Sequence, residues 1–152
     1  MKLLCVKSPI GKLTIAESGG FITHIYFEDE APQTTTQSSP LLRLASIQLK
    51  EYFDGKREVF ELPIKPNGGE FFQRVWQTMQ DKVTFGQLIT YGQLASMVGK
   101  PKAARAVGMA NNRNPIPIII PCHRVVGANG NLTGFRAGLD VKRKLLQLEG
   151  VV

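Results

Sequence analysis

A cysteine followed directly by a histidine is the pair in this chain best suited to chemistry. Cys122 and His123 come after residues 114–121, an apolar stretch stiffened by prolines. A thiol attacks only as a thiolate, and its ordinary pKa of about 8.5 leaves it largely protonated at neutral pH. A neighbouring base or cation can activate it. The sequence therefore predicts a cysteine nucleophile, helped by an imidazole, at the end of a stiff and buried segment.

An acid near the C-terminus is a candidate partner for this imidazole. A helix is predicted from Asp140, as its N-cap, to Gly150. Its buried stripe is expected to consist of Val141, Leu145 and Leu148. Glu149 would then lie in the final turn, where the helix dipole disfavours a carboxylate. His123 would compensate that charge, but an exposed acid tolerated at small cost explains the pattern equally well.

Two short helices are predicted before the cysteine. Thr90 and Gln93 have the spacing of a capping box, and Gly99 would end the helix that they begin. A short turn then leads to a second helix over residues 102–112. Such a pair is typical of the helix-turn-helix in DNA-binding proteins. Many helical hairpins bind nothing, so the pattern alone leaves the function open.

The second of these helices has one face suited to a polyanion. Helical spacing predicts an inward face of Ala103, Ala106, Val107 and Ala110. The outward face would consist of Arg105, Gly108, Met109 and Asn112, which include one cation and no acid. A glycine within a helix costs about 1 kcal/mol relative to alanine, so Gly108 is expected to serve packing or a close contact. A solvated face with an ordinary arginine is the alternative.

The excess positive charge of the chain lies in the same region. The net charge is +7, yet residues 1–90 carry ten basic and ten acidic side chains. Residues 91–152 carry nine basic side chains and only two acids, Asp140 and Glu149. A one-sided basic field indicates a polyanionic partner, most simply nucleic acid. A role in solubility alone is the other interpretation.

The chain of 152 residues is long enough for one ordinary domain or two small ones. The predicted fold class is a small α/β domain over residues 1–64, a linker over 65–70 and a mostly α domain over 71–152. The first domain would contain strands over residues 3–6, 13–16, 21–27 and 59–64, with a loop over 29–39. A helix would begin after Ser39, its N-cap, with Pro40 at the first position, and end at Gly55.

The cysteine count indicates a reducing compartment. Cys5 and Cys122 stand far apart and form no disulfide framework. His24 and Cys5 are too few for a metal site. The N-terminus lacks the apolar core of a signal peptide, and no stretch approaches the ~20 apolar residues of a membrane span. We therefore expect a cytoplasmic protein, associated with the nucleoid if the source is prokaryotic, with no membrane partner.

Four motifs together resemble one known family. They are Tyr91-Gly92-Gln93-Leu94-Ala95, Ala104-Arg105-Ala106-Val107-Gly108, Asn114-Pro115 and Pro121-Cys122-His123-Arg124-Val125. In this order and spacing they are similar to those of the O6-alkylguanine-DNA alkyltransferases. The resemblance covers residues 71–150, and the first seventy residues fit the smaller N-terminal α/β domain of that family only loosely.

The resemblance implies catalytic roles for five residues. Cys122 would accept the alkyl group, and His123 would act through a bound water as the base that produces the thiolate. Glu149 would orient His123 and balance its charge. Asn114 would lie at the hinge between the recognition helix and the active-site loop. Tyr91 would press on the phosphate beside the lesion and supply the proton that neutralises the departing guanine.

The resemblance also implies a DNA interface and a substrate pocket. Arg105 would fill the gap left by a flipped nucleotide, while the helix-turn-helix enters the minor groove. The other implied DNA contacts are Ala104, Gly108, Met109, Asn112, Tyr91 and Arg124. The pocket would be formed by Cys122, Val125, Pro117, Phe135 and Arg136. Some relatives have Tyr and Ser in place of the last two, so the tolerance for bulky alkyl groups stays open.

The function expected from this resemblance is repair of DNA. The protein would act as a monomer on double-stranded DNA carrying O6-alkylguanine, with no cofactor and no metal. Methyl transfer from O6 of guanine, or O4 of thymine, to Cys122 would give a thioether that water does not readily cleave, so each molecule would act once. Base flipping would expose the lesion at a cost of a few kcal/mol. A cysteine hydrolase, which turns over, and a helix-turn-helix regulator, which needs no thiol, are the rival hypotheses.

Overall fold

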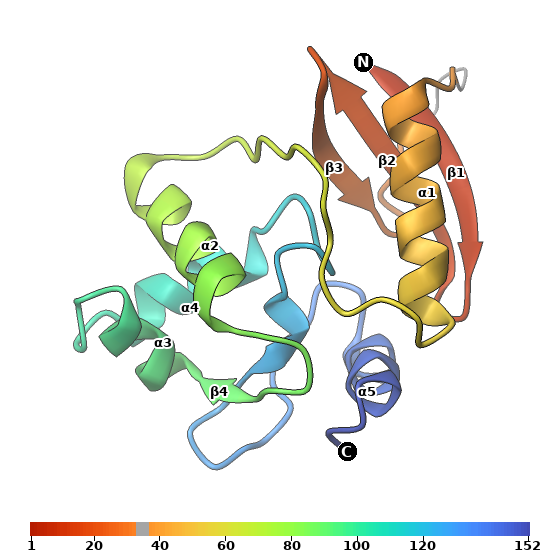
Figure 1. Ribbon diagram of the computed structural model, residues 1–152. Helices are drawn as coiled ribbons and strands as arrows, with labels where there is room; N and C mark the ends of the chain where they lie inside the picture. The colour runs from red at the N-terminus through yellow and green to blue at the C-terminus, as the bar shows by residue number, and fades with distance from the viewer. Residues whose placement is uncertain (33–36) are drawn as a thin grey trace. The chain divides into compact units, whose positions relative to one another are not determined.

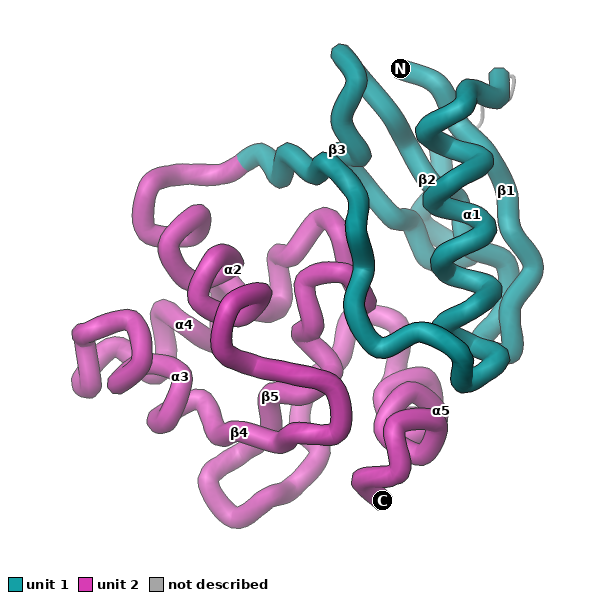
Figure 2. The backbone as a smooth tube through the Cα atoms, in the orientation of Figure 1, with its two compact units in different colours: residues 1–67 teal, residues 68–152 magenta. Residues whose placement is uncertain are grey.

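The computed structural model describes residues 1–32 and 37–152. Its contacts divide the chain into two compact units, Met1–Asn67 and Gly68–Val152, which are coloured separately in Figure 2. The first unit is an antiparallel sheet with one helix, and the second is mostly helical (Figure 1). This confirms the prediction of a small α/β domain followed by a mostly α domain. Residues 33–36 of the predicted loop lie outside the described residues.

The first unit is built on three strands in the order β1-β2-β3. The strands are β1 (Lys2–Ser8), β2 (Gly11–Ser18) and β3 (Phe21–Tyr26), each antiparallel to its neighbour. Helix α1 (Pro40–Phe53) packs on the sheet and begins as predicted, because the Ser39 hydroxyl accepts the Leu42 N–H at 3.1 Å. The buried core consists of Leu3, Leu13, Ile15, Ile22, Ile25, Leu42, Ala45 and Leu49.

The strand predicted over residues 59–64 is wrong. Only Ile64 pairs, in an isolated parallel bridge with Ile22 of β3. The Ile22 N–H donates to the Pro63 carbonyl at 2.9 Å, and the Lys65 N–H donates to the Ile22 carbonyl at 2.9 Å. Proline has no N–H to continue a ladder, and Val59 is 69% exposed, so the apolar residues of this segment do not form a strand.

The second unit contains four α-helices and a two-stranded sheet in its described residues. The elements are α2 (Glu70–Lys82), β4 (Ile89–Thr90), α3 (Tyr91–Met97), α4 (Ala104–Asn112), a 3-10 turn (Cys122–Arg124), β5 (Val125–Val126) and α5 (Leu139–Leu148). The Thr90–Gln93 capping box that begins α3 is confirmed. Trp76 of α2 is buried, and its Nε1–H donates to the Ala110 carbonyl of α4 at 2.8 Å. This bond fixes α4 against α2.

The parallel pairing of β4 with β5 brings two distant parts of the sequence together. Ile89 lies opposite Val125, and Thr90 lies opposite Val126. Tyr91 follows Thr90 directly, while Val125 follows the turn that holds Cys122. The start of α3 is therefore held beside the cysteine.

Candidate active site

The segment that delivers the cysteine is fixed by one buried amide. Asn114 is fully buried; its Nδ2–H donates to the Ile120 carbonyl at 2.7 Å, and its Oδ1 accepts the Ile116 N–H at 2.9 Å. Ile118 lies between Ile116 and Ile120 and has a φ of +76°. Among the described residues, no other residue except glycine has a positive φ. That conformation is unfavourable for a β-branched side chain and is held only by its surroundings. The Asn114 bonds therefore define the backbone that precedes Cys122.

Cys122 is buried at the start of the 3-10 turn, with 5% of its surface exposed. Its N–H donates to the Ile120 carbonyl at 2.8 Å, and its carbonyl accepts from Asn111 Nδ2 at 3.4 Å. Burial raises the pKa of the thiol, while hydrogen bonding by Asn114 and the charges of Arg136 and Lys142 lower it. At neutral pH the resting cysteine is therefore a thiol that needs a base.

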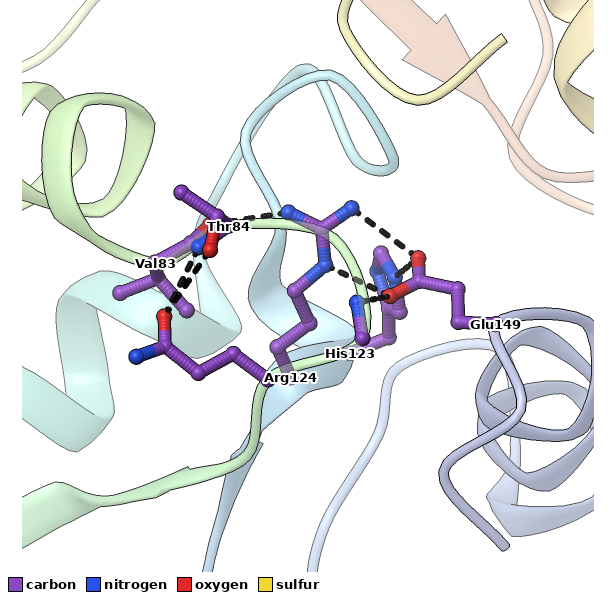
Figure 3. A network of polar contacts seen from close by, with 7 residues as sticks. Val83, Thr84, His123, Arg124 and Glu149 are labelled. Atoms are coloured by element: carbon purple, nitrogen blue, oxygen red, sulfur yellow. Dashed lines mark hydrogen bonds and ion pairs between the residues drawn. The ribbon is translucent and has the colours of Figure 1, made fainter.

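His123 is fully buried and bound to Glu149, as the sequence predicts. The Nε2–H donates to Glu149 Oε2 at 2.6 Å (Figure 3). Burial lowers the pKa of the imidazole, against the opposing effect of Glu149, so the ring is neutral at neutral pH. With its proton on Nε2, the ring has a free lone pair on Nδ1, an atom that has no hydrogen-bond partner among the described residues. Such a nitrogen is suited to accept a proton.

Arg124 has a different role from the DNA contact predicted for it. Its guanidinium donates twice to Glu149, from Nε at 2.9 Å and from Nη2 at 3.0 Å, and once to the Val83 carbonyl at 2.8 Å (Figure 3). Arg124 is only 5% exposed, and its guanidinium lies 5.9 Å from the centre of the Phe85 ring. These contacts occupy the cation inside the unit, which corrects the prediction that it meets DNA.

Glu149 is therefore the centre of a buried polar cluster. Besides His123 and Arg124, the carboxylate accepts the backbone N–H of Gly86 at 3.1 Å. Helix α5 ends at Leu148, so Glu149 is its C-cap. The unfavourable position at the negative end of the helix is offset by the guanidinium and by these hydrogen bonds. The exposed acid considered as the alternative is excluded.

Lys142 is a site residue that the sequence analysis missed. The side chain is fully buried, and its Nζ donates to the carbonyls of Val125 at 2.7 Å and Thr133 at 3.1 Å. Its ammonium also lies 5.8 Å from the centre of the Phe135 ring. Helix α5 begins one residue before Asp140, with Gly138 as its N-cap, which corrects the predicted cap.

The buried stripe of α5 differs accordingly from the predicted one. It consists of Lys142, Leu145 and Leu146, whereas Val141 and Leu148 are half-buried. A lysine at i with leucines at i+3 and i+4 is the signal that could have revealed the buried cation.

The four residues predicted for the outer face of α4 are exposed, except Gly108, which is half-buried. Arg105, Met109 and Asn112 are exposed, and Ala104 and Gly108 are half-buried. Ala106, placed inward by the sequence, is exposed, and Asn111 is buried instead. Helix α4 begins at Ala104, two residues later than predicted, and its buried residues are Val107, Ala110 and Asn111, so the buried face is rotated toward Asn111.

Tyr91, the first residue of α3, lies beside this face. A methyl group on Gly108 would meet the Tyr91 ring at 3.7 Å, an ordinary van der Waals contact, so the packing of these two residues does not by itself require a glycine.

The predicted pocket residues come from three segments. Pro117 and Val125 are buried on either side of Cys122 in the sequence, and Phe135 is half-buried in the loop before α5. Arg136 is exposed, and its Nη1 donates to the carbonyls of Asn112 at 2.9 Å and Asn114 at 3.0 Å. In residues 1–32 and 37–152, no group of three or more His, Cys, Asp or Glu side chains is arranged to hold a metal ion. No helix in these ranges is long and apolar enough to cross a membrane.

A buried thiol follows a stiff segment and precedes a neutral histidine bound to a glutamate, and the neighbouring helix α4 exposes Arg105. These features are typical of a protein that uses a cysteine as its nucleophile. Comparison with known proteins identifies the family. The description "6-O-methylguanine DNA methyltransferase, DNA binding domain" matches residues 70–151, and the ribonuclease-like domain of the same family matches residues 1–66.

Individual relatives agree with this assignment. The methylated-DNA–protein-cysteine methyltransferase of Methanosarcina acetivorans is 44% identical over 149 residues, covering 95% of both chains. That of Haemophilus influenzae is 45% identical, covering 95% of this chain and 83% of its own. The crystal structure of Mycobacterium tuberculosis OGT in complex with DNA matches with a TM-score of 0.89 and 41% identity, covering 98% of this chain and 92% of the other. The chain belongs to the 6-O-methylguanine DNA methyltransferase family.

Proposed function

We propose that this protein repairs double-stranded DNA by moving an alkyl group from O6 of guanine to Cys122 in a single turnover. The observation that carries the proposal is the buried Cys122 thiol next to a neutral His123, whose Nε2–H is fixed by Glu149 and whose Nδ1 has no partner in the described residues. The family and the names of the relatives support methyl transfer from DNA to cysteine.

The chemical step uses these groups in order. His123 Nδ1 takes the thiol proton through a water molecule, since burial keeps the imidazole neutral and able to accept it. The sulfur lone pair then forms the S–C bond as the C–O6 bond breaks, and its electron pair stays on the guanine. Tyr91 donates the proton that neutralises the departing base. The product thioether is stable to water, so Cys122 is not regenerated.

The basic unit would bind the duplex through α3 and α4, acting as a helix-turn-helix in the minor groove. Arg105, exposed on α4, would fill the gap left by the flipped nucleotide, with Ala104, Gly108, Met109 and Asn112 close to the backbone. The complex of the Mycobacterium tuberculosis relative with DNA supports this partner. Flipping costs a few kcal/mol, and less for a poorly paired damaged base.

Several finer points belong to the same proposal. O4-alkylthymine would be a second substrate, and the protein would act as a monomer in the cytoplasm. A small domain over residues 1–64 and a linker over 65–70 would precede the acceptor domain.

The test is the mass of the whole protein after incubation with duplex DNA containing O6-methylguanine. We expect a gain of one methyl group, located on Cys122 by peptide mapping and absent from Cys122→Ser. The amount of product should equal the amount of protein and then stop rising. Repeated turnover would favour a hydrolase, and an unchanged mass would refute the proposal.

A further inference from the structure

The side chain of Arg136 attaches the loop before α5 to the C-terminal end of α4. Arg136 donates from one nitrogen, Nη1, to the carbonyls of Asn112 and Asn114, at 2.9 and 3.0 Å. Asn112 is the last residue of α4, so its carbonyl lies beyond the hydrogen-bond ladder of the helix. A cation is favoured at this negative end of a helix, and hydrogen bonds from a charged donor are stronger than neutral ones.

The point of attachment is the junction between the recognition helix and the segment that delivers the nucleophile. The side chain of Asn114 bonds to Ile116 and Ile120, and Ile120 in turn accepts the N–H of Cys122. A contact to the Asn114 carbonyl therefore acts on a backbone whose geometry is already fixed. The charge of Arg136 also reaches Cys122, where it favours the thiolate.

The other end of the loop is held by the buried Lys142. Its Nζ donates to the Thr133 carbonyl and lies over the ring of Phe135, the residue next to Arg136. Phe135 therefore contacts the buried cation and directly precedes Arg136, whose side chain is itself held at the end of α4. Lys142 also binds the Val125 carbonyl, beside Cys122 in the same site, so both cations tie the loop to the backbone around the nucleophile.

We propose that Arg136 is a positioning residue, which ties the pocket loop to the C-terminal end of α4 and thereby holds Phe135 over the reacting base before DNA binds. The inference rests on the proposed function. In this proposal Arg136 lies at the rim of the pocket. It acts on the site by positioning Phe135 and does not contact the alkyl group.

The test compares Arg136→Gln with Arg113→Gln in the full chain. Arg113 is exposed at the same end of α4 and is the matched control, because its loss removes a charge there but leaves the two carbonyl contacts intact. The substrate is free O6-benzylguanine, so that DNA affinity does not enter. The readouts are the rate of benzyl transfer to Cys122 and the hydrogen exchange of residues 127–138.

For Arg136→Gln we expect about a tenfold slower transfer, equivalent to ~1.4 kcal/mol, with faster exchange across the loop. Arg113→Gln should match the wild type in both measurements. Unchanged loop exchange in Arg136→Gln would overturn the proposal, even if the rate fell, because Arg136 would then act only through its charge on the thiol. If the wild type does not react with any O6-alkylguanine, the proposed function fails, whereas the exchange measurement still decides whether Arg136 holds the loop.

Discussion

The reactive thiol in this site is protected until a base is close to it. Burial raises the pKa of Cys122 and lowers that of His123, so both are uncharged at neutral pH in the resting protein. A proton must therefore move at the time of reaction, from sulfur toward the imidazole. This arrangement suits a protein that can react only once, because an exposed thiolate would be consumed by unrelated electrophiles.

Replacement of Arg124 by methionine tests the structural role of that residue. Glu149 would lose both guanidinium hydrogen bonds, which leaves a buried carboxylate without its neighbouring cation. Breaking a buried ion pair in this way costs about 3–5 kcal/mol, so Arg124→Met should lower the free energy of unfolding by that amount in urea titrations. A stability equal to the wild type, with weaker DNA binding, would restore the original assignment of Arg124 to the DNA interface.

Sequence reasoning found the residues whose signals are local. The Glu149 carboxylate at a helix end predicted a partner, and His123 is that partner. Arg124 was misplaced because its burial depends on the Val83 carbonyl and the Phe85 ring, about forty residues earlier in the chain. No local pattern encodes such a contact. Lys142 was missed since a lysine is rarely fully buried, and only the bound carbonyls make it possible here.

At the scale of single elements, α4 combines a buried face with an exposed face that carries one cation, Arg105. Val107, Ala110 and Asn111 are buried, whereas Arg105 and Met109 are exposed. The same helix receives the Trp76 bond on its inner side and the Arg136 bonds at its end. Helix α4 is therefore a rigid element that can present Arg105 in a fixed direction.

Replacement of Arg105 by alanine tests the function of that exposed face. Without a side chain to fill the gap, the extruded nucleotide should return to the stack more readily. We expect transfer from methylated duplex DNA to slow by about 10–100-fold, a fraction of the few kcal/mol that flipping costs.

The reaction of Arg105→Ala with free O6-benzylguanine should stay close to that of the wild type. Arg43→Ala, which removes an exposed cation from α1, is the control for loss of charge. Equal losses with both substrates would show that Arg105 does not act on the flipped base.

The start of an element was predictable where capping residues define it. Ser39 with Pro40, and Thr90 with Gln93, begin α1 and α3 as expected. The start of α5 was displaced to Leu139 because Gly138, with a φ of +100°, makes the turn that Asp140 was expected to make. Residues 59–64 were predicted as a strand from their apolar residues, but only Ile64 pairs. An apolar pattern does not predict a strand where a proline, here Pro63, cannot donate to the hydrogen-bond ladder.

For the whole molecule, alkylation adds a group to a packed interior. Cys122 is 5% exposed, and its neighbours Pro121 and His123 are buried. Extra volume in such a site typically costs about 1–3 kcal/mol. After reaction with O6-benzylguanine the melting temperature should therefore fall by several degrees, as about 1 kcal/mol shifts a domain of this size by roughly 2–8 °C.

The measurement is a thermal unfolding curve before and after the reaction. Cys122→Ser, treated with the same reagent, should show no change. A melting temperature that rises on alkylation would mean that the pocket accommodates the group and that the spent protein is not marked by loss of stability.

The bond between Trp76 and α4 has a practical consequence. The chain contains one tryptophan, so its emission has a single source, and that indole is bound to the Ala110 carbonyl near the C-terminal end of α4. Any displacement of the helix changes the surroundings of the ring. The intrinsic fluorescence of the unlabelled protein should therefore follow duplex binding and alkyl transfer in real time, with no dye attached.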